Sequence, residues 1–418
     1  MYKERTNLGL RQRKRRSTGR MGKPGILALV AMASVGLAAC GSTTTGGTAS
    51  NKPDKVQIAC EGPFTGDEAS IGAGALQACQ LAVDDFNKAG GVHGTSVKLI
   101  TWDDNHSPQT AATLQAVGIS DPTVLGIVGP MNSGVVLGTI QGLQNANPPL
   151  PFVTESASNT TITEHGNSVA HRVNARDDQQ GPADAKFMID QGAKKVEVMD
   201  ARSDYSTALA DIVAKYLADH APSITVQRDS AQHGQTDFRT IVQRINAFRA
   251  DWVFFADEGP EAAPFVQQLK SGGLTIGTNI QFLGTDGEDD PTIITGSQGA
   301  FLGAYASNIT PDPASVATAA DMITRFKSKF GADSIGKAGP FYGSAYSATQ
   351  VLLQAIANSP VNNGRISRAD VISHLASDTF QTVLGPVKYN AKGDVTTVAI
   401  GLFQAKGTNM VSVKSITG

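Results

Sequence analysis

The sequence predicts an α/β protein of two lobes, each built on a doubly wound parallel sheet with helices on both faces. From residue 55 onward, short β-branched runs alternate with amphipathic helical stretches, and the alternation starts again after residue 175. Two successive series of this kind are typical of two parallel-sheet lobes. Of the 418 residues, 40% are apolar and 17% are charged, so the chain can bury a sizeable core and does not belong to the disordered class.

The first series contains four expected strands with helices between them. Residues 74–89 are predicted to be helical because Leu76, Cys79, Val83 and Phe86 recur at steps of three and four residues. Other helices are expected to start at Ser107, as an N-cap before a first-turn proline, and near residue 133. The expected strands are 56–60, 97–102, 124–128 and 151–154.

The second series follows the same pattern. Residues 236–249 form an expected helix with five apolar residues on one face. The expected strands of this series are 195–199, 224–228, 252–255 and 280–283. The C-terminal part adds helices near 313–330, 340–358 and 367–377, and then short strands.

The N-terminus has the pattern of a secretory signal. Residues 1–39 hold nine of the 35 basic residues and one of the 37 acidic ones, and an uncharged apolar stretch runs from residue 25 to residue 39. The four residues from Leu37 to Cys40, at the end of this stretch, resemble a bacterial lipobox, which implies a lipidated Cys40. The alternative is an ordinary cysteine after a membrane anchor. Residues 40–53 form an expected flexible tether. Met1 and Met21 remain alternative starts.

The rest of the chain excludes several function classes. It carries 26 basic and 36 acidic residues, which argues against a nucleic-acid binder. Cys60 and Cys79 are expected to form a disulfide in an oxidising compartment, or else to be two small buried thiols. No metal-binding motif, phosphate loop or nucleophile elbow is present, so no metal, cofactor or enzymatic activity is expected, and the histidines are assigned to surface or core packing.

A set of short motifs occurs in a fixed order along the chain. These motifs are the segments 56–66, 85–92, 103–104, 126–130, 179–182, 204–205, 237–238, 284–287, 385–386 and 393–394. Each is weak by itself, but their order from about residue 55 to residue 405 looks like that of the substrate-binding proteins of branched-chain amino acid ABC importers.

This resemblance implies a type I periplasmic binding protein fold with three chain crossings, near residues 174, 308 and 391. The first lobe would comprise 54–174 and 309–391, and the second 175–308 and 392–418. Closure of the two lobes on a small solute would present the closed form to a membrane permease and its ATPases. The protein is expected to be a monomer, anchored by lipid to the outer face of the bacterial cytoplasmic membrane.

In the first lobe, the resemblance places a ligand carboxylate at the start of the helix near residue 133. Ser133 matches the family serine that binds this carboxylate, and a helix N-terminus suits an anion; the alternative is that it caps its own helix. Ser156, Ala157 and Ser158 match a loop that offers a hydroxyl and a backbone carbonyl, with a plain polar turn as the alternative.

In the second lobe, Tyr205 matches a tyrosine that closes over the ligand, or else a half-buried packing residue. Asp286 matches the acid that pairs with the ligand ammonium, or else satisfies its own turn. The chain departs from the family pattern at Ile71 and at Asp257 to Gly259, where aromatic residues are usual. Asp257 and Glu258 would form a solvated lip or select a polar or cationic side chain.

Three alternatives to amino acid import remain at this point. The fold also hosts enzymes, so an enzyme is one of them. A second is a lipid-anchored sensor that presents its ligand to a signalling receptor. The third keeps transport but changes the solute to an amide, urea or polyol.

Overall fold

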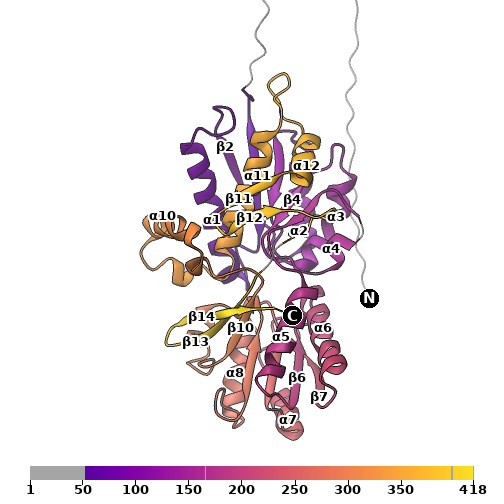
Figure 1. Cartoon of the computed structure of the whole chain (residues 1–418), viewed down its shortest axis with the longest axis vertical. Coiled ribbons are helices and arrows are strands. Elements are labelled where there is room, and N and C mark those ends of the chain that lie inside the picture. Colours follow the sequence, from indigo (N-terminus) through magenta and orange to yellow (C-terminus); the bar gives the residue numbers. More distant parts are fainter. Residues whose placement is uncertain (1–51, 165, 397–398, 418) are drawn as a thin grey trace, which may run out of the picture. The chain divides into compact units, whose positions relative to one another are not determined.

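Two sheets organise the computed structural model, which describes residues 52–164, 166–396 and 399–417 (Figure 1). The first has five parallel strands in the order β2-β1-β3-β4-β5, and the second has seven in the order β14-β13-β10-β9-β8-β6-β7. Strands β6 to β10 of the second sheet are parallel, whereas β13 and β14 are antiparallel to their neighbours. The predicted α/β class is confirmed. The expected signal segment, Cys40 and the tether up to residue 51 lie outside the described residues.

The strands agree closely with the sequence prediction, apart from two additional ones. Val56–Gly62, Val97–Asp103, Val124–Val128 and Phe152–Thr154 are β1 to β4, and the unpredicted Ala170–Arg172 is β5. The second sheet contains β6 (Lys195–Asp200), β7 (Thr225–Ser230), β8 (Trp252–Ala256), β9 (Gln281–Gly284), the unpredicted β10 (Tyr305–Asn308), β13 (Ile400–Lys406) and β14 (Asn409–Ile416). A separate hairpin consists of β11 (Thr379–Thr382) and β12 (Gly385–Lys388).

Twelve α-helices occur in the described residues. They are α1 (Ala69–Lys88), α2 (Pro108–Ser120), α3 (Ser133–Asn145), α4 (Thr161–Glu164), α5 (Asp177–Asp190), α6 (Asp204–His220), α7 (Arg239–Phe248), α8 (Ala262–Ser271), α9 (Pro291–Gly296), α10 (Ala320–Phe330), α11 (Tyr342–Asn358) and α12 (Arg368–Ser377). Short 3-10 turns are η1 (Asp286–Glu288), η2 (Pro313–Ser315), η3 (Ala317–Ala319) and η4 (Ile335–Lys337). Ser107 caps α2 as predicted, since its Oγ accepts a hydrogen bond from the Thr110 N–H at 3.2 Å.

Alternation along the strands explains why helices cover both faces of each sheet. In β1, Ile58 and Cys60 pack into the core beneath α1 and α11, whereas Ala59 between them faces the core beneath α3. In β8, Phe254 packs towards α6 and Phe255 packs towards α7 and α8. Figure 1 shows α1 and α11 side by side over the five-stranded sheet. Cys60 and Cys79 form a disulfide between β1 and α1, with Cα atoms 6.5 Å apart.

The chain passes three times between the two sheets. It leaves the first sheet after β5, returns after β10 to α10 and α11, and crosses again after β12 to β13. The exact lobe boundaries at residues 174, 308 and 391 stay a prediction. No helix within residues 52–164, 166–396 and 399–417 has the length and apolar character to cross a membrane.

Candidate functional site

Loops at the carboxyl ends of the parallel strands surround a small cavity. This edge is where open α/β sheets usually bind ligands. The first sheet contributes the loops after β3 and β4, and the second contributes the loops after β8 and β9. The cavity measures about 20 Å³, which is room for about one water molecule. Its lining residues are Ile71, Met131, Asn132, Ser133, Ser156, Tyr205, Asp257, Glu258, Asp286, Gly287 and Phe341.

Ser133 lies at the first position of α3 and is 2% exposed. Its Oγ accepts hydrogen bonds from the backbone N–H groups of Ser158 and Asn159, both at 3.2 Å. The N-cap residue is Asn132, whose side chain makes no capping bond. The Ser133 hydroxyl therefore joins α3 to the loop after β4 and does not cap its own helix.

The loop after β4 brings one of its three predicted residues to the cavity. Ser156 lines the cavity and donates its hydroxyl to the carbonyl of Met131 at 2.8 Å. Ala157 and Ser158 are buried beside it and are not among the lining residues. The Ala157 carbonyl accepts a 3.0 Å hydrogen bond from Arg172. Of this loop, only Ser156 is placed to reach a molecule in the cavity.

Tyr205 and Asp286 lie next to each other in the second-lobe wall of the cavity. The Tyr205 hydroxyl donates to Oδ1 of Asp286 at 2.8 Å, and Nε2 of Gln180 donates to the same oxygen at 3.1 Å. Asp286 is 5% exposed. Burial raises the pKa of Asp286, and the hydrogen bonds from Gln180 and Tyr205 oppose that rise. No cation pairs with this carboxyl among the described residues.

Two further acids line the cavity at the end of β8. Asp257 is fully buried and Glu258 is 7% exposed, so the alternative of a solvated lip is wrong. Burial raises the pKa of Glu258 to about 7, with the nearby charge of Glu68 adding to the rise. Gly287 permits this arrangement, because a Cβ there would lie 2.5 Å from the Asp257 carbonyl. The second-lobe wall of the cavity is therefore rich in carboxyl groups.

A buried polar group connects these acids to the first lobe. Nδ2 of Asn132 donates to Glu68 at 2.7 Å and to Glu258 at 3.2 Å. His106 Nδ1 lies 2.5 Å from Glu68, and its Nε2 lies 3.8 Å from Glu258. Burial lowers the pKa of His106, but the hydrogen bond that it donates to Glu68 and the charges of Glu258 and Glu68 raise it to about 9. These contacts join loops of the two sheets beside the cavity.

The sequence interpretation missed several lining residues. Asn132 is the direct neighbour of the predicted Ser133, so extending that motif by one position would have included it. Met131 carries no polar signal, and Phe341 is distant in sequence from every other lining residue. Gln180 belongs to the noted segment 179–182, but its contact with Asp286 depends on how α5 packs against η1.

The fold and this site define a class of protein: two α/β lobes with three chain crossings and a polar cavity between facing loops. The chain belongs to the periplasmic binding protein family, because the sequence model of that family matches residues 55–409. The resemblance to substrate-binding proteins of branched-chain amino acid importers is thereby confirmed.

Named relatives extend this match over most of the chain. An "Amino acid binding protein" of Pseudomonas aeruginosa is 27% identical over 343 residues, which cover 81% of this chain and 87% of the relative. The "Leu/Ile/Val-binding protein BraC3" of Rhizobium johnstonii is 28% identical and covers 86% and 94% of the two chains. The crystal structure of a leucine-binding protein, LivK, from Thermotoga maritima has a TM-score of 0.76 at 24% identity, covering 86% of this chain and 98% of that one.

Proposed function

We propose that this protein is the extracytoplasmic solute-binding component of an ABC importer and that it captures an amino acid between its two lobes. The observation that carries this proposal is the carboxyl of Asp286. It is buried in the cavity wall and accepts two hydrogen bonds, without a cationic partner in the described part of the chain. A buried carboxylate in this position is favoured by a cationic ligand group.

The opposite wall suits the other end of an amino acid. The N-terminus of α3, a helix of 13 residues, lies at Ser133, and the free N–H groups of such a terminus attract a carboxylate. Ser156 adds a hydroxyl on the same side. An amino acid would thus lie with its carboxylate at α3 and its ammonium at Asp286, covered by Tyr205.

The lining of the cavity also indicates which amino acid side chain the protein would prefer. Ile71, Met131 and Phe341 give it an apolar part, whereas Asp257 and Glu258 give it an acidic one. The two acids favour a polar or cationic side chain over that of leucine. Because the lining residues come from loops of both sheets, capture would proceed by separation and closure of these facing loops.

The N-terminal sequence supports the cellular part of the proposal. The signal-like segment and Cys40 fit a lipid anchor on the outer face of the cytoplasmic membrane. Incorporation of labelled palmitate into the full chain, and its loss in Cys40→Ser, would test the anchor. Copurification with a permease and its ATPases, rather than with a receptor kinase, would test the transport role against that of a sensor.

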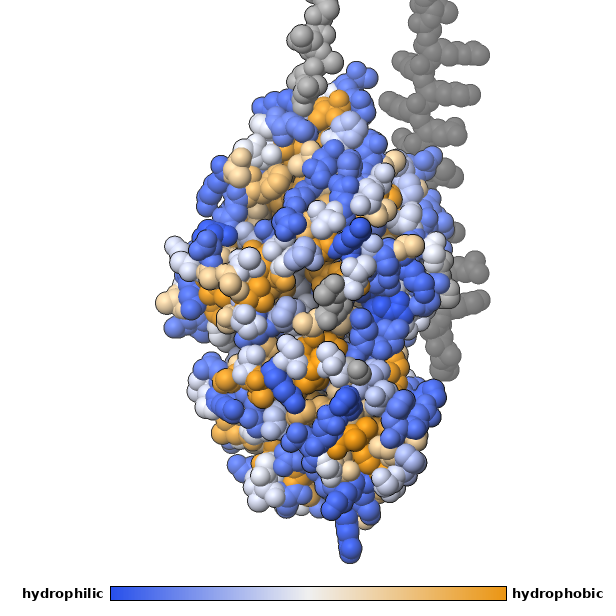
Figure 2. Space-filling view, in the orientation of Figure 1, coloured by the Kyte–Doolittle hydropathy of each residue, from blue (hydrophilic) through white to orange (hydrophobic). Residues whose placement is uncertain are grey.

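The monomeric state also belongs to this proposal. On the face drawn in Figure 2, hydrophobic side chains are scattered among hydrophilic ones. Large exposed hydrophobic residues of the described chain are Val117, Leu302, Val411 and Val413. Val411 and Val413 lie two residues apart on the edge strand β14, and so small an apolar patch does not need a partner surface to cover it.

The experiment that tests the binding function is thermal unfolding of the purified protein with each of the twenty amino acids, common amides and polyols. A ligand at 100 times its dissociation constant adds about 2.7 kcal/mol of stability. Stabilisation by a few L-amino acids supports the proposal. Stabilisation only by an amide or polyol would overturn the role given to Asp286, and chemical conversion of the bound ligand would show an enzyme instead.

A further inference from the structure

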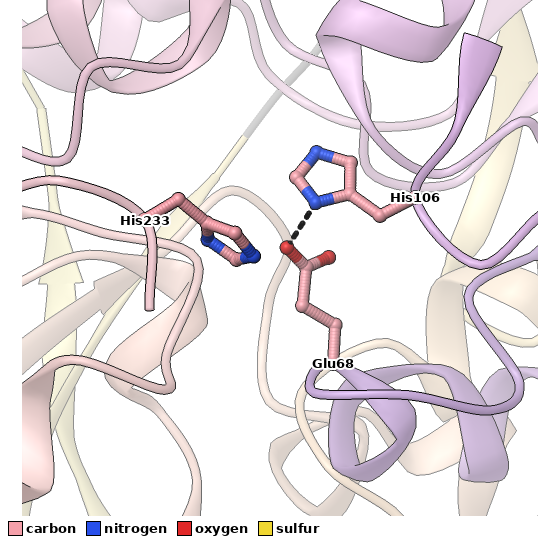
Figure 3. A group of neighbouring side chains, drawn as sticks. All are labelled: Glu68, His106 and His233. Atoms are coloured by element: carbon pink, nitrogen blue, oxygen red, sulfur yellow. Dashed lines mark ion pairs between the residues drawn. The ribbon is translucent and has the colours of Figure 1, made fainter. Parts of the chain in front are cut away.

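A cluster of metal-ligating side chains lies beside the cavity. Glu68 precedes α1, His106 follows β2, and His233 lies in the loop between β7 and α7. One ligand atom of each residue can be chosen so that all three lie within 4.8 Å of one another. Figure 3 shows both imidazole rings turned towards the Glu68 carboxylate. Glu68 and His106 belong to the first sheet's side and His233 to the second's.

The surroundings of the three side chains match those of metal ligands. Nδ1 of His233 lies 3.4 Å from Oε1 of Glu261, a residue whose side chain is fully buried. Nε2 of His106 faces Glu258 at 3.8 Å. Histidines that bind metals commonly present one ring nitrogen to the metal and the other to a carboxylate. Each imidazole here has such a carboxylate next to one ring nitrogen: Glu258 for His106 and Glu261 for His233.

The charge balance also favours a cation. Three carboxyl groups, those of Glu68, Glu258 and Glu261, surround the two imidazoles, which are their ion-pair partners among the described residues. Oε2 of Glu261 is buried without a hydrogen-bond partner in the described part of the chain. A divalent metal ion would bring more positive charge among these buried acids than the imidazoles alone supply.

The donor set and access select the kind of metal. Two imidazoles and one carboxylate suit zinc, whereas calcium and magnesium prefer oxygen ligands alone. Tetrahedral zinc requires ligand atoms about 3.4 Å apart. The atoms that are up to 4.8 Å apart would have to approach by little more than about 1 Å, and Nδ1 of His106 and Oε1 of Glu68, now at 2.5 Å, would have to separate by about 1 Å. The side chain of His233 is 45% exposed, which leaves both freedom to move and a path from solvent.

We propose that Glu68, His106 and His233 form a zinc site that bridges the two lobes and strengthens their closure on the solute. No spacing motif predicts this site, because its members are 38 and 127 residues apart in the sequence. The bridging role rests on the proposed binding function, whereas the metal site itself does not.

The test is zinc titration of the protein, purified after expression of the full chain through a tag without histidine. We expect one zinc per chain by competition with a chromophoric chelator. His233→Gln and His106→Gln should each weaken zinc affinity at least tenfold, while the control His220→Gln, at an exposed histidine of α6, should leave it unchanged. Cobalt should give the visible absorption bands of a tetrahedral site in the parent and lose them in His233→Gln.

Each outcome decides one part of the proposal. No zinc binding, or equal binding by the parent and the two cluster variants, would overturn the site. Amino acid affinity measured in EDTA tests the binding function by itself. Zinc should then tighten amino acid binding several-fold in the parent and not in His233→Gln, since coupling between the two ligands is reciprocal. Equal affinities with and without zinc would overturn the bridging role.

Discussion

The hydroxyl of Tyr205 and the carboxyl of Asp286 are hydrogen-bonded at 2.8 Å inside the cavity wall. Tyr205 comes from the first turn of α6 and Asp286 from η1 after β9, 81 residues further along the chain. The bond fixes the carboxyl without neutralising it. One carboxylate oxygen is thus held by Tyr205 and Gln180, and the group remains available to a cation.

Asp286→Asn tests whether that carboxyl pairs with a ligand ammonium. We expect the variant to lose about 2–5 kcal/mol of affinity for its amino acid, because the ammonium would lose its counter-charge. Calorimetric titration measures the change, with Asp333→Asn at an exposed position as the control. A loss below about 1 kcal/mol would indicate that the ligand carries no ammonium at this position.

Acid should weaken amino acid binding through the same carboxyl. Burial raises the pKa of Asp286, and only its ionised form attracts an ammonium. Affinity should therefore fall as the pH drops through the raised pKa, with proton release on binding near that pH. The measurement is titration in buffers of different ionisation enthalpy. The same pH dependence in Asp286→Asn would assign it to another group.

Glu155→Gln should change how stability depends on pH. Glu155 is fully buried, and burial raises its pKa to about 8, with the charge of Asp104 adding to the rise. Between its ordinary pKa and about 8, the folded form binds more protons than the unfolded form, so this group makes stability decrease as pH rises. As the pH rises, the free energy of unfolding measured in urea should therefore fall less steeply in the variant than in the parent. The difference should be up to about 1.4 kcal/mol per pH unit. Parallel curves for parent and variant would contradict the burial of an ionisable group there.

Asp394 should be essential for stability at the third crossing. Its carboxylate pairs with the fully buried Arg172 at 2.8 Å and with Arg176 at 2.9 Å. Asp394→Asn leaves a buried guanidinium uncompensated, which costs about 3–5 kcal/mol. Urea unfolding measures this, and Asp190→Asn, which breaks an exposed pair with Lys186, should change little. Equal stability of both variants would show that Arg172 finds another partner.

The disulfide should stabilise the protein by lowering the conformational entropy of the unfolded chain. Cys60 and Cys79 close a loop with a sequence separation of 19, for which loop entropy predicts about 3 kcal/mol. Cys60→Ala combined with Cys79→Ala should lower the urea midpoint accordingly. Two free thiols in the unreduced protein, counted by alkylation and mass spectrometry, would contradict the pairing.

Strands with long β-branched runs could be predicted from sequence, and two short polar strands could not. Ala170–Arg172 and Tyr305–Asn308 have no apolar pattern of their own. β5 forms because it pairs with β4, and β10 because it lies between β9 and β13. Their conformation therefore depends on neighbours that are distant in sequence, which local propensity does not describe.

In the site, too, some features could be predicted from the sequence and others could not. Ser133, Ser156, Tyr205, Glu258 and Asp286 all line one cavity, because most of them follow the carboxyl ends of parallel strands in the two sheets, and the loops at these ends face the same cavity. Which way each residue of a loop points could not be predicted, so Ala157 and Ser158 were named although they lie beside the cavity. The partners of His106 were missed because the sequence places it in a loop without a motif.

The most direct test of the account is a crystal structure of the protein with the amino acid that stabilises it most. We predict the ligand carboxylate at the N-terminal N–H groups of α3 beside Ser133, and the ammonium within hydrogen-bond distance of Asp286. The reversed orientation, a ligand bound outside the cavity, or a ligand without contact to Asp286 would contradict the central claim.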